Sequence, residues 1–304
     1  MGALNVMELK LKHSRWVMRS HGLEARLLQL DNGSCIHCWL PAPWPRPADA
    51  STRPLKPPLL LLHGFGADGT LGWERQVPSF ANQYSLFIPD LLFFGQSMTT
   101  NKQRSEIFQA ECMFAMMEKL GVGECVVCGH SYGGFVAYRM AHLYPSYIKR
   151  VIIISSGILM DATTSNIPLL ETFGASTIEE ILIPHDVLDF KKGLSFIFHK
   201  IPWLPSFVIK DMFALFSGDR QRRHELMDGI ILGKKNAPPL PKINQDVLII
   251  WGDHDQVFNL DLAYSLKEFL GDHVALTVIN EVGHMPQMEN SRDVNKSILE
   301  FLSS

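Results

Sequence analysis

The chain has 304 residues, of which 46% are hydrophobic and 19% are charged, and its formal net charge is −3. This profile is typical of a globular protein that is long enough for one large core with an added subdomain, or for two small domains. The nearly balanced charge argues against a nucleic-acid partner, and the lack of a run of five basic residues argues against docking on an anionic membrane. The N-terminus lacks the pattern of a secretory signal, and no apolar run reaches the roughly 18 residues of a membrane span. We therefore expect a soluble cytoplasmic protein without stable membrane insertion, of unknown oligomeric state.

The five cysteines include two pairs with the C-x-x-C spacing of zinc and redox sites, Cys35 with Cys38 and Cys125 with Cys128. Both pairs fall in stretches that we predict to be strands. Residues three apart on a strand point to opposite faces of the sheet, so neither pair converges on one metal ion. We therefore interpret these residues as structural thiols and expect no metal and no cofactor.

The first sixty residues predict a hairpin followed by an irregular connection. Residues 24–30 and 34–42 have strand character and flank Asp-Asn-Gly, a strong hairpin signal. Residues 43–58 are too rich in proline for regular structure and predict a surface loop. The run "LLLLHGFG", residues 59–66, is a continuous apolar stretch that ends in glycines. This pattern is typical of a parallel strand that is buried on both faces.

Further along the chain, strand patterns and helix patterns alternate. Short apolar runs typical of buried strands are followed by periodic stretches typical of amphipathic helices. Such alternation indicates an α/β protein in which helices cover both faces of a mostly parallel sheet. The predicted strands, with their turns, are 85–95, 124–131, 149–157, 245–255 and 274–284, and the predicted helices include 71–83, 105–121 and 132–145.

Residues 159–241 interrupt this alternation, because they contain helical stretches but no buried strand run. We predict that they form a helical cap inserted into a core domain made of residues 1–158 and 242–304. The cap is rich in aromatic residues, which either pack against the sheet domain or line a pocket beneath a lid. These aromatic residues are Phe190, Phe196, Phe198, Trp203, Phe207, Phe213 and Phe216. As pocket residues we select Phe94, Trp203, Phe207 and Met285.

Ser131 stands between a predicted strand and a predicted helix in the motif Gly-x-Ser-x-Gly. A tight strand-to-helix turn holds such a serine in a strained backbone conformation and exposes its hydroxyl at the edge of the sheet. Gly129 and Gly133 let the strand and the helix approach without a collision of side chains. The helix that follows also directs backbone N–H groups toward this position. The context therefore predicts a catalytic nucleophile.

A serine needs a base, and the base needs a carboxylate to orient it. Among the 12 histidines we select His284, which follows the last predicted strand, whereas His63 and His130 lie in tight turns and are interpreted as structural. Asp255, in "WGDHD", is the favoured acid because it lies further into its loop than Asp253, which more simply braces the turn. Asp161 is a weaker third candidate, since it follows another strand. The chain order Ser, Asp, His is that of the G-x-S-x-G enzymes.

The segment "HGFG" follows the first buried strand and predicts one half of an oxyanion hole. The amides of Phe65 and Tyr132 can both point at one oxygen, because one lies after that strand and the other directly after Ser131. A donor of this kind stabilises a transition state by about 3 kcal/mol. Gly64 and Gly66 keep the backbone open at this point.

In this order, "HGFG", "GHSYGG", "WGDHD" and "VGH" resemble the α/β-hydrolase superfamily, and specifically its branch of esterases, lipases and C–C bond hydrolases with a small cap. The resemblance runs from about residue 58 to the C-terminus and implies an α/β-hydrolase fold with an inserted helical cap. It implies Ser131 as the nucleophile, Asp255 as the acid, His284 as the base and the amides of Phe65 and Tyr132 as the oxyanion hole.

Three departures from the family pattern bear on the reaction. Epoxide hydrolases and haloalkane dehalogenases have Asp where this chain has Ser131, and commonly Pro where it has Gly66, which argues against both activities. C–C hydrolases often have Asn where this chain has His130, which favours ester chemistry. Leu92 and Phe93 replace the usual Pro-Gly after Asp-Leu, so the loop beside the pocket is more apolar than in most relatives.

We interpret the protein as a serine hydrolase that cleaves an ester of a hydrophobic small molecule through an acyl-enzyme intermediate. The same residues would serve C–C hydrolysis of a diketone. Because chemistry resides in the site rather than in the scaffold, a non-hydrolytic cyclase or acyltransferase and a small-molecule receptor with a slow triad also remain open.

Overall fold

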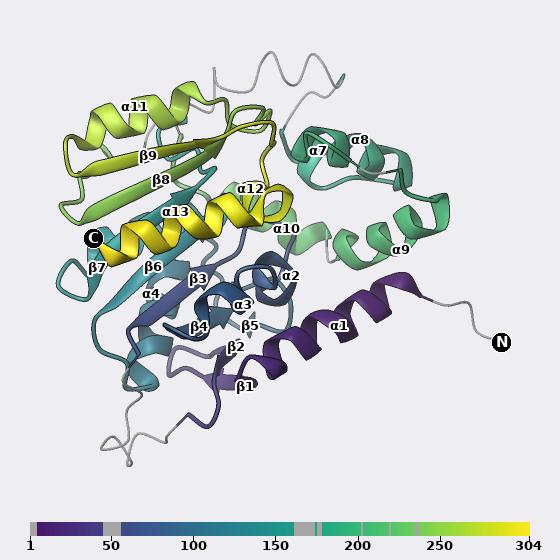
Figure 1. Ribbon diagram of the computed structural model, residues 1–304. Helices are drawn as coiled ribbons and strands as arrows, with labels where there is room; N and C mark the ends of the chain where they lie inside the picture. Colours follow the sequence, from purple (N-terminus) through teal and green to yellow (C-terminus); the bar gives the residue numbers. More distant parts are fainter. Residues whose placement is uncertain are drawn as a thin grey trace.

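The computed structural model describes residues 5–44, 56–160, 174, 178–201, 203–218, 220–234 and 237–304 (Figure 1). Over these residues the core is one sheet with the strand order β1-β2-β4-β3-β6-β7-β8-β9, and β5 pairs with β2. Strands β1 and β2 form an antiparallel hairpin, β2 pairs antiparallel with β4, and all pairs from β4 to β9 are parallel. The strands are β1 (Leu23–Gln29), β2 (Ser34–Pro41), β3 (Pro58–Leu62), β4 (Ser85–Pro89), β5 (Met98–Thr99), β6 (Cys125–His130), β7 (Ile148–Ile154), β8 (Asp246–Gly252) and β9 (Val274–Ile279).

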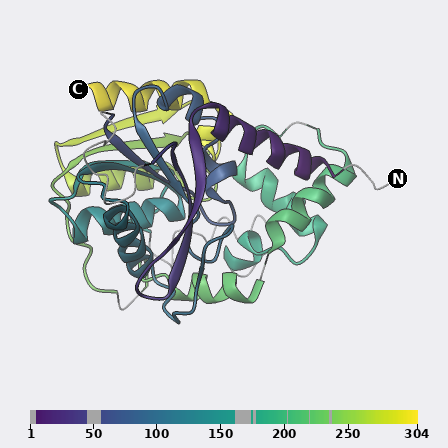
Figure 2. The same cartoon turned by 90° about the horizontal axis from the view of Figure 1, so that it is seen from below.

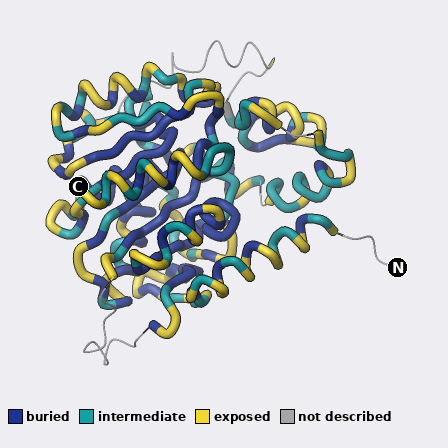
Figure 3. The backbone as a smooth tube through the Cα atoms, viewed as in Figure 1, coloured by how far each residue is buried: buried dark blue, intermediate teal, exposed yellow. Residues whose placement is uncertain are grey.

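Helices cover both faces of this sheet, and the strands supply side chains to each face in alternation. In β3, Leu60 and Leu62 belong to one apolar cluster, whereas Leu59 and Leu61 belong to the other. The first cluster contains α4 (Glu106–Lys119), α5 (Tyr132–Leu143) and α11 (Asp261–Leu270). The second contains α1 (Val6–Ser20), α2 (Gly69–Trp73), α3 (Val77–Phe80) and α13 (Ser291–Ser303). The buried strands appear as the dark core of Figure 3, and the predicted α/β fold is confirmed.

The cysteine pairs follow the strand geometry. Cys125 and Cys128 lie on β6 and belong to opposite apolar clusters, so their side chains diverge. All five cysteines are free thiols. Burial raises the pKa of Cys125 to about 12, and burial also raises the pKa of Cys128. These thiols therefore stay protonated at neutral pH and pack as small apolar groups.

Two elements differ from the sequence predictions at the N-terminal side. The sequence analysis assigned no element to residues 6–20, but they form helix α1, which Asn5 caps by accepting a hydrogen bond from the Glu8 amide at 3.0 Å. The single helix expected over 71–83 is divided into α2 and α3, because Pro78 lacks an N–H group and takes the first turn of a new helix. Most of the proline-rich segment 43–58 lies outside the described residues.

Between β7 and β8, the described residues form four helices, which we call the cap helices: α7 (Ile178–Leu182), α8 (Val187–Ile197), α9 (Ser206–Ser217) and α10 (Arg220–Gly229). Figure 1 shows α7, α8 and α9 grouped beyond one end of the sheet, and Figure 2 shows the same group alongside α1. The amide of Val6 donates to Asp211 on α9 at 3.1 Å, which fastens α1 to this group. No helix in the described part of the chain is both long enough and apolar enough to cross a bilayer.

Candidate active site

Ser131 occupies the turn between β6 and α5 with φ 50° and ψ −119°, a left-handed conformation that a residue with a side chain rarely adopts. Hydrogen bonds to its backbone N–H and C=O groups hold it there. The Ser131 amide donates to the Ile154 carbonyl at 2.9 Å, and the Ser131 carbonyl accepts from Ser156 Oγ at 2.7 Å and from the Gly134 amide at 2.8 Å. Strain of this kind costs about 1–3 kcal/mol and is offset by the surrounding structure.

The glycines of the motif are required by close backbone contacts. A Cβ on Gly129 would lie 2.1 Å from the Gly133 carbonyl oxygen, and a Cβ on Gly133 would lie 2.3 Å from the Leu62 carbonyl oxygen. These neighbours are backbone atoms of β3 and α5, so they cannot rotate away. The two glycines therefore let α5 start directly against the strands that carry the site.

We expect Gly133→Ala to lower the free energy of unfolding by about 3 kcal/mol, because overpacking against fixed backbone atoms is among the strongly destabilising changes. Urea unfolding followed by circular dichroism measures the loss. Gly123→Ala is the matched control, since a Cβ there meets nothing within 4 Å and its φ is not positive. Equal stability of the two variants would contradict the tight contact between β3 and α5.

Ser131, His284 and Asp255 form one buried chain of hydrogen bonds. The Ser131 hydroxyl donates to His284 Nε2 at 2.9 Å, and His284 Nδ1 donates to Asp255 Oδ2 at 2.9 Å and Oδ1 at 3.1 Å. Asp255 Oδ1 also accepts from the amides of Val257 and Phe258, both at 2.9 Å. These donors fix the orientation of the carboxylate, and the carboxylate in turn favours the histidine tautomer whose Nε2 can accept a proton.

The other two acid candidates are placed differently. Asp253 makes an ion pair at 2.7 Å with His254, which is exposed, and it accepts from the Val282 amide at 3.4 Å. Burial raises the pKa of Asp253, but the hydrogen bonds from His254 and from backbone amides, together with the charge of His254, outweigh burial and lower the pKa overall. Asp253 therefore braces its own turn, and Asp161 lies outside the described residues.

The two histidines interpreted as structural are both buried and engaged. His63 donates through Nδ1 to the Gly64 carbonyl at 2.8 Å and accepts at Nε2 from the Leu91 amide at 2.9 Å. His130 Nε2 donates to the carbonyl of His284 at 2.9 Å. Burial, together with repulsion from the nearby His284, lowers the pKa of His130 to about 3. The neutral His130 ring thus holds the His284 loop in place through its hydrogen bond to the His284 carbonyl.

The amides of Phe65 and Tyr132 have no hydrogen-bond partner among the described residues. Tyr132 is the first residue of α5, so its N–H belongs to the positive end of the helix. The loop that carries Phe65 presses against Ser131, because a Cβ on Gly64 would lie 3.2 Å from Ser131 Cβ and 2.6 Å from His130 Nδ1. Two free donors on segments that flank the hydroxyl are what an oxyanion requires.

Aromatic rings form an apolar wall beside these groups. The ring of Phe94 lies 5.3 Å from that of Phe65 and 6.4 Å from that of Tyr132, and the ring of Phe258 lies 5.5 Å from that of His284. Phe94 is buried in this wall, and Met285 is half-buried directly after His284. The wall excludes water from the hydrogen-bond chain, which strengthens its electrostatic interactions.

Trp203 and Phe207 differ from the sequence prediction, which placed them in the same pocket. Their side chains are 85% and 56% exposed, on the outside of the cap helices. Trp203 lines a separate cavity between α8 and α9, and none of the residues that line it belongs to the triad or to the aromatic wall. Aromatic spacing on a helix does not reveal which face turns inward, so the sequence pattern could not distinguish these positions.

Phe93 is a further strained residue beside the site, with φ 76°. This is the conformation that glycine prefers, and here a bulky side chain adopts it. The guanidinium of Arg104 lies 4.3 Å from the centre of the Phe93 ring, and the same group forms an ion pair at 2.9 Å with Glu225 on α10. Stacking on a cation thus holds the ring, and it connects the loop after β4 to the cap helices.

Glu289, at the end of α12 (Pro286–Glu289), is a residue that the sequence analysis missed. Its carboxylate accepts from the Gly283 amide at 2.7 Å, from the His199 amide at 3.0 Å and from the Lys200 amide at 3.1 Å. The amide of His284 itself donates to the Ile197 carbonyl at 2.8 Å. The loop of the proposed base is therefore tied directly to the chain that leaves α8, and the only sequence signal is an acid five residues after the histidine.

We expect Glu289→Gln to slow covalent modification of Ser131 by a fluorophosphonate about tenfold, because the amide can no longer accept three N–H donors and His284 loses its fixed position. The melting temperature should fall by only a few degrees. Glu300→Gln on α13 is the matched control, since its carboxylate pairs at 3.8 Å with the exposed Lys296. A purely structural role would lower the melting temperature and leave the labelling rate of the folded protein unchanged.

Comparison with known proteins agrees with the observed fold. The family profile described as alpha/beta hydrolase fold matches residues 57–177 and 218–291, which is more than half of the chain. The chain belongs to the alpha/beta hydrolase family.

Two curated relatives of this family member differ in the reaction that their names state. Lipase 3 of Moraxella sp. (strain TA144) is 30% identical over 245 residues, which cover 78% of this chain and 74% of the lipase. Human epoxide hydrolase 4 is 25% identical over 282 residues, which cover 81% of this chain and 72% of the relative. The shared family therefore establishes a hydrolase fold without fixing the substrate.

The fold is also similar to that of solved structures. A crystal structure of a membrane phospholipase A, described as a bacterial virulence factor, superposes with a TM-score of 0.80 at 24% identity. The superposition covers 98% of this chain and 92% of that one. At this identity the likeness concerns the fold alone, and the reaction has to be inferred from the site.

Proposed function

We propose that this hydrolase-family chain is a serine hydrolase that cleaves carboxylic esters of hydrophobic small molecules. The observation that supports the proposal most strongly is the continuous hydrogen-bond chain from Ser131 through His284 to Asp255 at a strained strand-to-helix turn. Hydroxyl, imidazole and carboxylate in this arrangement form the acyl-transfer triad. We further propose that residues 159–241 form a cap over a core of residues 1–158 and 242–304.

In the proposed first half-reaction, Ser131 Oγ attacks the ester carbonyl carbon while its proton moves to His284 Nε2. The carbonyl oxygen takes the negative charge, and the amides of Phe65 and Tyr132 stabilise it. Asp255 stabilises the imidazolium without taking the proton. When the tetrahedral intermediate collapses, the C–O bond of the ester breaks and the imidazolium returns its proton to the leaving alcohol.

In the second half-reaction, His284 Nε2 removes a proton from a water molecule, and the resulting hydroxide attacks the acyl carbon. The oxyanion forms again at the same amides. Its collapse breaks the bond to Ser131 Oγ, which recovers the proton from His284. The net reaction adds one water to the ester and releases one acid and one alcohol, and the enzyme is regenerated.

A serine at position 131 favours ester hydrolysis over epoxide hydrolysis for a chemical reason. A carboxylate nucleophile opens an epoxide to an ester, which water can then hydrolyse. Ser131 would instead form an ether, which this site has no means of hydrolysing. The apolar wall of Phe65, Phe94 and Tyr132 favours a hydrophobic group next to the carbonyl.

Labelling with a fluorophosphonate, followed by peptide mass spectrometry, tests the proposal. We expect the phosphonyl group on Ser131, together with turnover of aryl esters whose acyl chains are graded in length. Diketones and epoxides in the same panel separate C–C and epoxide hydrolysis from ester hydrolysis. Labelling at a different residue, or turnover of a diketone but of no ester, would contradict the assignment.

A further inference from the structure

Exposed apolar side chains gather on the outside of the cap helices. Leu188 on α8 is 62% exposed, and Ile201, Trp203 and Phe207 are also exposed on the chain that leads from α8 into α9. A monomeric soluble protein rarely exposes so many large apolar groups in one region, and such patches mark sites of interaction. The patch needs a partner that is itself apolar where it touches these residues.

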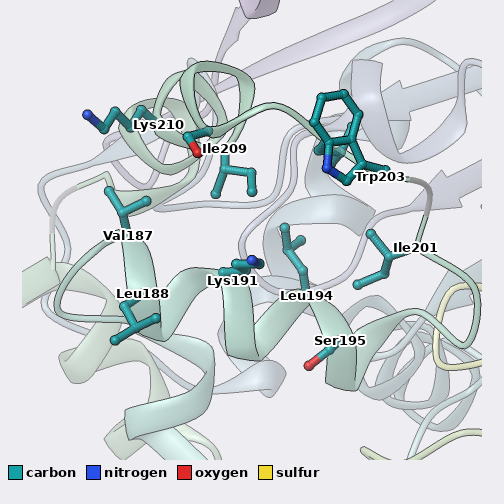
Figure 4. Close-up of a pocket in the computed structure, with 11 residues that line it drawn as sticks. Val187, Leu188, Lys191, Leu194, Ser195, Ile201, Trp203, Ile209 and Lys210 are labelled. Carbon is teal, nitrogen blue, oxygen red and sulfur yellow. The ribbon is translucent and has the colours of Figure 1, made fainter.

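The patch surrounds a cavity of about 570 Å³ between α8 and α9, shown in Figure 4. Its walls are mainly aliphatic, with Leu194 and Ile209 among them, and Lys191 and Lys210 are the charged residues that line it. Among the described residues, no carboxylate lines the cavity. An apolar hollow that carries only positive charge fits a partner with apolar chains and anionic groups.

The charges around the patch leave both lysines available. Neither Lys191 nor Lys210 forms an ion pair with any residue that the structure describes. Of the acids on the same helices, Asp189 lies 3.7 Å from Lys192, and Asp211 accepts from the Val6 amide. The local acids are thus engaged elsewhere, and the two ammonium groups can face an external anion.

Helix α1 packs against α9, one of the two helices that carry the cavity. Figures 1 and 2 both show this packing, and Val6 is bonded to Asp211. The exposed side chains of Leu9, His13 and Trp16 follow one another at helical spacing, on the side opposite buried residues of α1. Trp16 is 61% exposed, and a tryptophan next to basic residues is typical of a segment that lies in a membrane interface.

We propose that the cavity between α8 and α9, together with the outer side of α1, is a docking surface for a bilayer that contains anionic phospholipids. Trp203, Phe207 and Leu188 insert among the acyl chains, and Lys191 and Lys210 contact the headgroups. This is peripheral binding and requires no membrane-spanning helix. It departs from the expectation that the absence of a basic run argues against docking on an anionic membrane, because Lys191 and Lys210 lie on different helices and the fold brings them to one cavity. On the basis of the proposed function, the substrates of Ser131 are then esters that partition into the membrane.

Two other occupants of the surface fit less well. In a symmetric pair of chains, the same surface would meet itself, and Lys191 and Lys210 would face lysines of the second copy without acids to offset them. A single amphiphile bound in the cavity would be enclosed by its walls, whereas Trp203 on the rim is 85% exposed and projects beyond them.

Sedimentation with vesicles tests the proposal, using the Ser131→Ala background so that hydrolysis cannot alter the lipid. We expect binding to phosphatidylcholine vesicles that contain phosphatidylserine, and weaker binding to phosphatidylcholine alone. Lys191→Glu with Lys210→Glu should raise the Kd for the anionic vesicles at least tenfold. Tyr264→Ala on α11 is the matched control, because Tyr264 is exposed far from the cap in the sequence and on another helix. With Ser131 intact, the lysine variants should hydrolyse a short soluble aryl ester at the rate of the unaltered chain.

Brominated phospholipids add a positional readout, because bromine quenches only tryptophans that enter the acyl region. Trp39, Trp44, Trp73 and Trp251 are buried in the protein, so quenching reports on Trp16 and Trp203. We expect quenching that falls when Trp203 is replaced by phenylalanine. Three results would each overturn the proposal: no vesicle binding, a dimer in light scattering that shields Trp203, or binding of monomeric fatty acid without binding of vesicles. None of these three results depends on whether Ser131 acts as a nucleophile, so failure of the docking proposal can be distinguished from failure of the proposed function.

Discussion

We expect Ser131→Ala to lower kcat for a short aryl ester by a factor of about 10³ or more, with no loss of folded protein. The hydroxyl is the only group at the turn that can form the acyl-enzyme, so its removal leaves the oxyanion donors and the binding surface to act alone. Loss of Oγ also relieves no strain, because the backbone of residue 131 keeps its bonds to Ile154, Gly134 and Ser156. Steady-state hydrolysis and thermal unfolding measure the two effects separately.

Ser297→Ala provides the matched serine control. Ser297 lies on α13, where its hydroxyl bonds only to the Asp293 carbonyl of its own helix at 3.0 Å, so its removal should leave both kcat and the melting temperature unchanged. If Ser131→Ala retained the turnover of the unaltered chain, the hydrolysis would proceed without an acyl-enzyme at this position, and the proposed mechanism would fail.

The second large effect is expected for Asp255→Asn, which should lower kcat by about 10⁴. An asparagine of the same shape presents an N–H group where the carboxylate accepted a proton. It therefore favours the histidine tautomer that carries its proton on Nε2, and that nitrogen can no longer accept the proton of Ser131. The Val257 and Phe258 amides can still donate to the side-chain oxygen and preserve its orientation. The substitution should therefore change the position of the proton on His284 without changing the fold.

The comparison with Asp253→Asn makes this test specific. Asp253 is two residues away and faces His254 at the surface, so its replacement should change kcat by less than a factor of about three, which corresponds to under 1 kcal/mol. Hydrolysis rates of the two variants, measured at the same pH, decide between the acids. If Asp253→Asn lowered kcat more than Asp255→Asn did, Asp253 rather than Asp255 would be the acid that orients His284.

The geometry of the site could be anticipated from the sequence because its residues are fixed by sheet topology. In a parallel sheet the strand ends meet at one edge, so Ser131, Asp255 and His284 had to approach one another once their strands were adjacent. The order β6-β7-β8-β9 supplies that adjacency. The glycines at 129 and 133 carried the additional information that the turn at Ser131 is tight.

Helix α1 could not be recognised in the same way, because its buried side is not a continuous apolar stripe. Ser14 and Lys10 occupy positions on the buried side where apolar residues would be expected. The Ser14 hydroxyl and the Lys10 ammonium group both donate to the carboxylate of Glu74, which follows α2. Leu9 and Trp16 lie on the outer side and obscure the periodicity further. A tertiary ion pair thus replaces the hydrophobic pattern that a sequence reveals.

The link between Glu289 and the cap helices was equally hidden. Its three partners are the backbone amides of residues 199, 200 and 283. Almost every residue type has a backbone amide, so the sequence at these positions does not indicate the contact. The positions of Trp203 and Phe207 were missed because burial on a cap helix depends on how that helix packs. Where a contact is made by backbone, or where a helix has two apolar sides, composition and spacing do not determine the outcome.

The location of β9 at the margin of the sheet has a consequence for how the protein loses activity. His284 is supplied by the segment that leaves this outermost strand, whereas Ser131 leaves a central one. Margins of a sheet open at lower free energy than its centre. Detachment of β9 would move the imidazole of His284 away while Ser131 and α5 stayed folded. Heat or denaturant should therefore abolish hydrolysis at a lower temperature or concentration than the one that unfolds the whole chain.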